Sequence, residues 1–214
     1  DRQPEFTQID IEMSFVNQDD IILLGTQITQ HIWKKILNIN LPENFPVLSY
    51  FDALEKYGTD KPDVRFEMEL KEFESYVKRS DFNAFKSILN SNGRVKALVC
   101  GNGERYSRKI IDELTEQLKR YHKAKGLAWM KCVNNSLDGG ISKFFNTEVQ
   151  EDIISDLKVK NGDIIFIIGD APKIMFSALG ALRIELANRE KLIDDKRWAP
   201  IWIVDFPLFE LNED

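Results

Sequence analysis

The sequence predicts an α+β protein in which a mixed α/β domain is inserted into a second, strand-containing core. Residues 6–16 alternate between apolar and polar side chains, which is typical of a strand with one buried face. Strand-like and helical patterns then interleave through residues 71–197. The charge also changes sign at both ends of that block. Residues 1–70 contain 6 basic and 13 acidic side chains, for a net charge of −7. Residues 71–197 contain 23 basic and 18 acidic side chains, for a net charge of +5. Residues 198–214 contain no basic and 4 acidic side chains, for a net charge of −4. Such a basic block between two acidic flanks indicates an inserted domain.

The expected first strand, residues 6–16, has two distinct faces. Its apolar row contains Ile9, Ile11, Met13 and Phe15, and its polar row contains Gln8, Asp10, Glu12 and Ser14.

Two helices should follow this strand in the first flank. Asp19 or Asp20 can cap a helix whose apolar spacing continues to Leu37. After a loop over residues 38–46, Ser49 can begin a short helix that Gly58 ends. These elements place residues 1–68 in one segment of the core.

The middle block, residues 69–197, is expected to form the inserted domain. The spacing predicts helices over residues 81–89, 107–121, 147–157 and 173–188, and strands over 94–100, 126–133 and 163–168. A short apolar strand over 201–204 then returns the chain, residues 198–214, to the core.

Composition excludes several classes of protein. Of the 214 residues, 43% are hydrophobic and 30% are charged, which is typical of a folded domain with a real core. No run approaches the ~20 apolar residues of a membrane span, and the start does not resemble a signal peptide. Two cysteines, Cys100 and Cys132, do not suggest a disulfide framework. We expect a soluble, cytoplasmic protein.

The polar row Gln8, Asp10 and Glu12 is the best candidate binding site on residue chemistry alone. Carboxylates two positions apart on a strand lie on one face, roughly 6.5–7 Å apart, and can receive an ammonium group or a ribose hydroxyl. The alternative is that this face is simply solvated.

Other motifs give weaker signals. Gly101-Asn102-Gly103 lacks the third glycine of a dinucleotide fingerprint, so it indicates a turn. Residues 169–173 lack the ending of a phosphate loop, and Pro172 at the start of a helix is sufficient reason for this run. Residues 119–125 (KRYHKAK) mix cations with aromatics, which suits either a phosphate backbone or a solvated helix end. No spacing indicates a metal site or a catalytic nucleophile, so we assign no metal ligands and no catalytic residues.

Seven runs of residues resemble the bacterial-type aspartyl-tRNA synthetases, which belong to class II. Residues 1–16 (DRQPEFTQIDIEMSFV) resemble the second half of motif 2. Residues 49–54 and 57–66 (YGTDKPDVRF) resemble the family's next signature, and residues 125–129, 162–166 and 178–183 resemble its GAD insertion domain. Residues 202–207 (WIVDFP) match the return to the catalytic core. The resemblance covers essentially the whole chain.

This resemblance implies an aspartate–tRNA ligase that uses ATP, with Mg²⁺, to activate aspartate and then transfers it to tRNA. Gln3 matches an ATP-contacting glutamine, and Asp10 matches an acid suited to the ammonium group of aspartate, with Gln8 and Glu12 flanking it. The family is homodimeric, and neither a membrane nor DNA is an expected partner.

Several parts of the family pattern are absent, among them motif 1, motif 3 and the motif 2 arginine. The chain therefore resembles an internal fragment, expected to be inactive alone. The alternative is a non-catalytic tRNA-binding or docking module of GAD type, as in tRNA-dependent amidotransferases. The motif 2-like residues 3–16 favour the synthetase.

Overall fold

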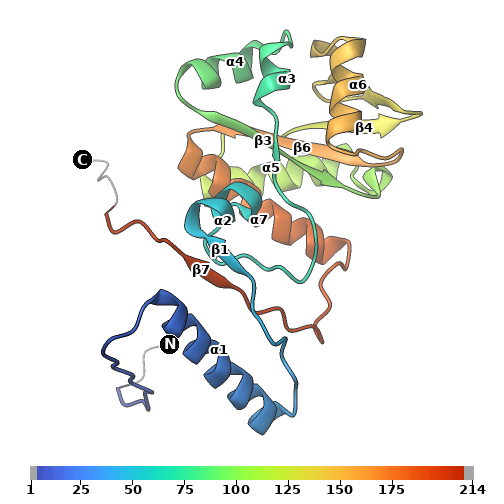
Figure 1. Ribbon diagram of the computed structural model, residues 1–214. Coiled ribbons are helices and arrows are strands. Elements are labelled where there is room, and N and C mark those ends of the chain that lie inside the picture. Colours follow the sequence, from blue (N-terminus) through green and yellow to red (C-terminus); the bar gives the residue numbers. More distant parts are fainter. Residues whose placement is uncertain (1–3, 210–214) are drawn as a thin grey trace. The chain divides into compact units, whose positions relative to one another are not determined.

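The structure, a computed structural model, describes residues 4–209 (Figure 1). Contacts between residues divide the chain into two compact units, which meet in the sequence between Pro46 and Val47. Each unit is described on its own.

The first unit is built around helix α1 (Gln18–Ile32), which continues as one wide turn with π-helical hydrogen bonding (Trp33–Leu37). A capping box begins α1. The side chain of Asn17 accepts hydrogen bonds from the amides of Asp19 and Asp20, and the carboxylate of Asp20 accepts one from the amide of Asn17. The predicted helix is therefore present, but Asn17 caps it and Asp20 is the reciprocal partner.

The predicted strand over residues 6–16 is wrong. The structure has no strand in residues 4–17, and the apolar and polar rows of this segment are both exposed. Phe15 also has a positive φ of 59°, which is incompatible with a continuous strand. A strand is stabilised by hydrogen bonds to a neighbouring strand, and no described segment pairs with this one. Alternation of side chains alone did not produce a strand.

The second unit contains a five-stranded antiparallel sheet. Its strands are β2 (Lys71–Glu72), β3 (Arg94–Cys100), β6 (Ile164–Asp170), β4 (Ala128–Val133) and β5 (Ser136–Asp138), in that spatial order. Every residue of the central strand β6 is buried. Its first five residues, 164–168, are all apolar and lie at the centre of the core, and Asp170 at its end is a buried carboxylate.

Helices cover both faces of this sheet (Figure 1). Helices α3 (Glu74–Lys78), α4 (Asn83–Asn90) and α6 (Thr147–Asp156) pack on one face with Ile165 and Ile167 of β6. Helices α5 (Arg108–His122) and α7 (Pro172–Arg189) pack on the other face with Ile164, Phe166 and Ile168. Because successive strand residues point to opposite faces, one strand supplies both cores.

The helices and strands predicted in the middle block are confirmed to within two residues at each end. The short elements α3, β2 and β5 were not predicted, nor were the 3-10 helices Gly103–Arg105 and Ser142–Phe144. They are too short to show a periodic pattern.

A second, two-stranded sheet joins residues far apart in the sequence. Strand β1 (Val47–Ser49) pairs in parallel with β7 (Trp202–Val204), in the register Val47 to Trp202 and Ser49 to Val204. Helix α2 (Tyr50–Tyr57) follows β1 directly. The five-stranded sheet and its helices thus lie, in sequence, between two strands that are neighbours in space. The boundaries at residues 68/69 and 197/198 stay predictions.

Candidate functional site

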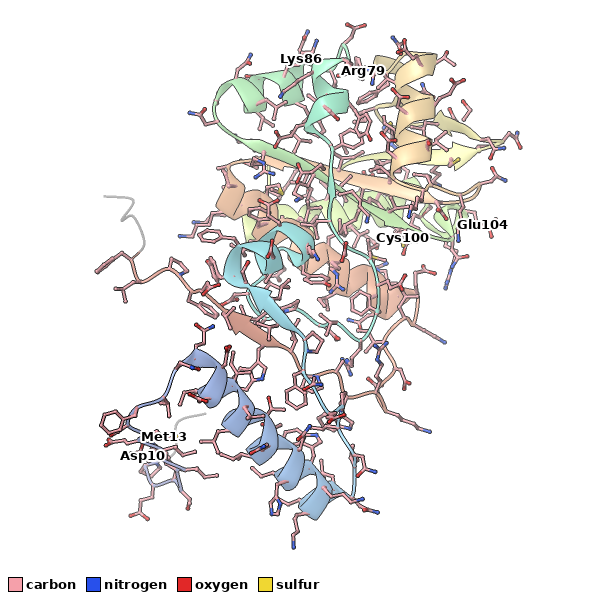
Figure 2. All side chains as sticks on the ribbon, viewed as in Figure 1. Asp10, Met13, Arg79, Lys86, Cys100 and Glu104 are labelled. Atoms are coloured by element: carbon pink, nitrogen blue, oxygen red, sulfur yellow. The ribbon has the colours of Figure 1, made fainter. Side chains whose placement is uncertain are left out.

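The predicted binding residues lie in the exposed segment before α1. The side chains of Gln8, Asp10 and Glu12 are exposed, and in the described part of the chain they have no hydrogen-bonding or ion-pair partner. Figure 2 labels Asp10 together with Met13, an exposed member of the apolar row. Gln3 lies outside the described residues. The structure therefore leaves these side chains available to a ligand but does not itself bring them together as a site.

The second unit has a large cavity next to α2 and α7. Its volume is about 1050 Å³. Phe51, Leu54 and Phe176 are among the apolar residues that line it, and Asp60 and Lys61 are among the polar ones. The hollow is open to solvent, and its lining combines apolar side chains with a few polar groups, as the linings of small-molecule sites do.

Two glycines allow the elements around this cavity to approach closely. Ser49 caps α2 by accepting a hydrogen bond from the amide of Asp52, as predicted, and Gly58 ends the helix at a φ of 72°. A Cβ atom on Gly58 would lie 2.4 Å from the carbonyl oxygen of Phe176 and 2.8 Å from the amide nitrogen of Gly180. The end of α2 therefore contacts the backbone of α7 directly.

Arg183 of α7 holds the loop that follows α2. Its guanidinium donates hydrogen bonds to the carbonyl oxygens of Asp63 (2.9 Å), Phe66 (3.1 Å) and Met68 (2.7 Å). The aromatic rings of Phe66 and Tyr57 lie 4.0 and 4.7 Å from its central carbon. Burial lowers the pKa of Arg183, although the nearby Tyr57 and Asp63 oppose this shift. The hydrogen bonds from Arg183 thus hold the backbone of residues 63–68 in place. Within this loop, Met68 has a strained φ of 102°.

Asp63 belongs to the same structural arrangement. Its carboxylate accepts hydrogen bonds from Nε and Nη2 of Arg65, which lower the pKa of Asp63. Arg197 in turn donates to the carbonyl oxygen of Arg65. The carboxylate of Asp63 is therefore already bound by Arg65 and is not free to bind a ligand. Asp60 and Lys61 line the cavity, and no ion pair is described for either of them.

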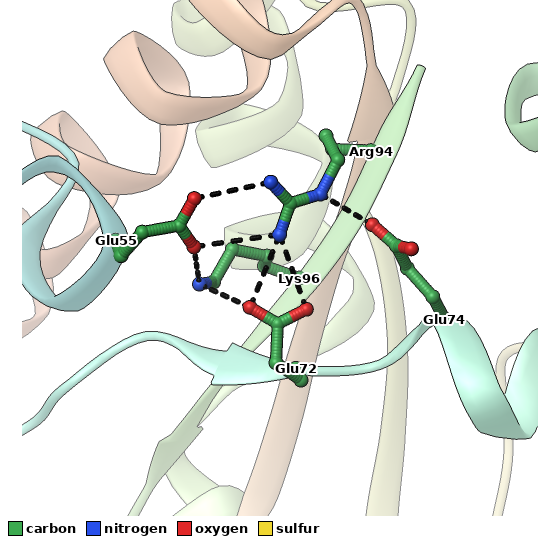
Figure 3. A network of polar contacts seen from close by, with 5 residues as sticks. All are labelled: Glu55, Glu72, Glu74, Arg94 and Lys96. Atoms are coloured by element: carbon green, nitrogen blue, oxygen red, sulfur yellow. Dashed lines mark hydrogen bonds and ion pairs between the residues drawn. The ribbon is translucent and has the colours of Figure 1, made fainter. Parts of the chain in front are cut away.

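A network of five charged groups joins α2 to the edge of the sheet (Figure 3). Lys96 is only 2% exposed, and its ammonium group contacts Glu55 (2.6 Å) and Glu72. Arg94 contacts Glu55 (3.0 Å), Glu72 (3.2 Å) and Glu74. Burial raises the pKa of Glu55, but hydrogen bonds from Lys96 and Arg94 outweigh this effect and lower it. Because each of these five charged groups is paired within the network, we interpret the network as stabilising the fold and not as a site for a ligand.

Sequence reasoning missed Arg183 and this network. A signal for Arg183 was present, since it is the only charged residue within the apolar run at residues 178–184 (ALGALRI). Lys96 likewise interrupts an apolar strand. A charge inside an apolar element requires buried partners.

The cysteines, the turn at residues 101–103 and the helix start at Pro172 are as the sequence suggested. Cys100 and Cys132 are buried and free, and burial raises the pKa of the Cys100 thiol to about 11, so it is not a thiolate at neutral pH. Asn102 has a left-handed backbone conformation, in agreement with the predicted turn.

Among residues 4–209, no three His, Cys, Asp or Glu side chains converge as metal ligands. No helix in that range is long and apolar enough to span a membrane.

Comparison with known proteins gives consistent matches along the chain. Residues 1–213 match the family described as "tRNA synthetases class II (D, K and N)". The aspartate–tRNA ligase of Staphylococcus saprophyticus is 44% identical over 215 residues, which cover 100% of this chain and 36% of the relative. The aspartate–tRNA(Asp/Asn) ligase of Brachyspira hyodysenteriae is 44% identical over 212 residues, or 99% of this chain and 36% of that protein. The chain therefore spans little more than a third of the length of these relatives.

Proposed function

Because the chain belongs to the class II tRNA synthetases of the D, K and N type, we propose that it is a segment of an aspartate–tRNA ligase. The observation that supports this most is the 44% identity to such a ligase over the whole chain. The reaction would join aspartate to ATP with release of pyrophosphate, and then transfer the aspartyl group to the terminal ribose of tRNA. ATP would enter as substrate with Mg²⁺ on its phosphates.

Asp10 is proposed to bind the ammonium group of aspartate through its carboxylate. Gln8 and Glu12 flank it, and Gln3 contacts ATP. Supporting this assignment, the four residues lie within one matched segment, and the three that are described have exposed side chains without a partner of their own. An unpaired carboxylate forms a strong charge-assisted hydrogen bond to an ammonium donor.

The non-catalytic GAD-type module is not favoured as an alternative. The relatives named above are ligases, and the match includes residues 3–16 as well as the middle block. For the intact protein we further propose a homodimer in the cytoplasm.

A chimeric ligase tests the proposal. The matched 215-residue segment of the Staphylococcus saprophyticus ligase is replaced by this chain. Aspartate-dependent ATP–pyrophosphate exchange is then measured, with asparagine and lysine as control amino acids. We expect exchange with aspartate only, because the segment would supply the ammonium-binding carboxylate.

Substitution of Asp10 in the chimera tests the assigned residue. We expect Asp10→Asn to lower kcat/KM for aspartate by about 100-fold or more, equivalent to roughly 3 kcal/mol of lost charge-assisted bonding. Asp19→Asn is the matched control, since Asp19 is also exposed and lies in the first turn of α1. A folded chimera without aspartate-dependent exchange would refute the proposed function. Equal kinetics for the two variants would refute only the role of Asp10.

A further inference from the structure

The end of helix α5 presents a concentrated positive surface. We call it the basic surface and define it by the exposed residues Lys119, Arg120, Tyr121, Lys123 and Lys125. Four of these five residues are cations, and residues 117–137 contain no carboxylate, although the whole chain has a net charge of −6. Positive charge is therefore gathered here against the overall acidity of the protein.

Part of this charge is not neutralised by the protein. Lys119 contacts Glu116 (2.9 Å), and the ammonium of Lys125 lies 3.5 Å from the buried carboxylate of Asp170. By contrast, Arg120 and Lys123 have no ion pair within residues 4–209. Lys123 is the C-cap residue of α5, where the helix dipole favours a cation, whereas Lys125 lies beyond the end of the helix.

An exposed aromatic ring lies in the middle of these cations. Tyr121 is 67% exposed, and the guanidinium carbon of Arg120 is 5.3 Å from the centre of its ring. Exposed aromatic rings next to arginine are favourable stacking surfaces for bases and riboses.

The basic surface is also held in a fixed shape. Nδ1 of His122 lies 2.9 Å from Oγ of Ser177, which fixes the end of α5 to α7. Ala124, between two exposed lysines, is buried in the core on this face of the sheet. A surface that is already ordered loses less entropy when it binds a partner.

We propose that the basic surface binds the sugar–phosphate backbone of tRNA. This inference rests on the proposed function and specifies which part of the chain contacts that substrate. Arg120 and Lys123 provide unneutralised charge for phosphate oxygens, and Tyr121 provides a face for a ribose or an unpaired base. Contacts of this kind depend on ionic strength and little on nucleotide sequence.

Binding of a labelled tRNA transcript to the full chain tests the proposal. Fluorescence anisotropy is recorded from about 20 to 200 mM KCl for the unsubstituted chain and for two double variants. The first variant, Arg120→Gln with Lys123→Gln, removes the unpaired cations. The matched control, Lys158→Gln with Lys160→Gln, removes two exposed lysines that follow α6, a helix on the opposite face of the sheet.

For the first variant we expect Kd to rise about tenfold at low salt, and the slope of log K against log salt to fall in magnitude by about 2. The control should bind like the unsubstituted chain. Equal losses for both variants, no loss for the first, or equally strong competition by a polyglutamate of matched charge would overturn the proposal. None of these results depends on pyrophosphate exchange by the chimera, so failure here is distinct from failure of the proposed function. Circular dichroism checks that each variant is folded.

Discussion

Two cationic side chains, Lys96 and Arg183, lie almost wholly inside the second unit, with 2% and 1% of their surfaces exposed. They are accommodated in different ways. Lys96 is neutralised by the carboxylates of Glu55 and Glu72, whereas Arg183 is satisfied by three backbone carbonyl groups and two aromatic rings. Arg183 therefore determines the course of the backbone, because the residues it binds must bring their carbonyl oxygens to it.

Replacement of Arg183 should destabilise the protein strongly. Arg183→Met keeps much of the side-chain volume but leaves three carbonyl groups without donors, at a cost of about 1–3 kcal/mol for each one that stays buried. We expect a loss of about 3 kcal/mol or more in the free energy of unfolding, measured by urea denaturation. The control is Arg189→Met on the same helix, where a partly exposed pair with Glu185 is worth about 0.5 kcal/mol. Similar losses for the two variants would contradict this role of Arg183.

At the scale of elements, the packing of α2 on α7 depends on the absence of a side chain. Gly58 has a positive φ, and it also lies against the backbone of α7. An ideal Cβ atom placed on Gly58 would be 2.4 Å from the nearest backbone atom of α7. Gly162 also has a positive φ, of 92°, but its Cβ position faces open space. Both glycines are needed for their positive φ, but only Gly58 also needs the absence of a Cβ atom for close packing. Comparing the two positions therefore distinguishes the effect of backbone conformation from the effect of packing.

Alanine substitutions at these glycines should have unequal effects. Gly162→Ala is expected to cost about 1–2 kcal/mol, the usual penalty for an L-residue in this backbone region. Gly58→Ala should cost at least about 1 kcal/mol more, because α2 must also move away from α7. Thermal or urea unfolding of the full chain measures both. An equal cost at the two positions would show that contact with α7 does not constrain α2.

At the scale of the whole molecule, the five-stranded sheet and helices α3–α7 all lie within residues 71–189. Both cores formed on this sheet are drawn almost wholly from that range. The paired strands β1 and β7 lie outside it and are joined to each other. This arrangement is why we continue to predict that residues 69–197 form an autonomous domain.

Expression of residues 69–197 alone tests that prediction. We expect one cooperative urea transition by circular dichroism, since the fragment keeps both cores. Its free energy of unfolding should be lower than that of residues 47–209, because the fragment lacks α2 and its loop. Part of α7 is then exposed, Arg183 loses the three carbonyl groups and two aromatic rings that it contacts, and Lys96 keeps Glu72 but loses Glu55. A broad, non-cooperative loss of signal would show that the block depends on the flanking segments for its structure.

The sequence by itself determined most local structure and the family. Capping at Ser49, the stop at Gly58 and the apolar run of β6 are decided by residues within a few positions of one another, and all are present in the structure. Residue chemistry indicated Gln8, Asp10 and Glu12 as a candidate site. Their roles, and the choice of Gln3, were assigned from a resemblance along the chain and stay predictions. Tertiary structure alone decided which strands form, since residues 6–16 alternate as a strand should and yet have no described strand to pair with. It also decided the partners of Lys96 and Arg183, which lie 24 to 41 and 115 to 120 positions away in the sequence. Caps, helix ends and apolar runs depend on interactions between residues that are close in the sequence, so the sequence pattern predicts them. Strand pairing and the neutralisation of buried charge depend on which distant segments the fold brings into contact.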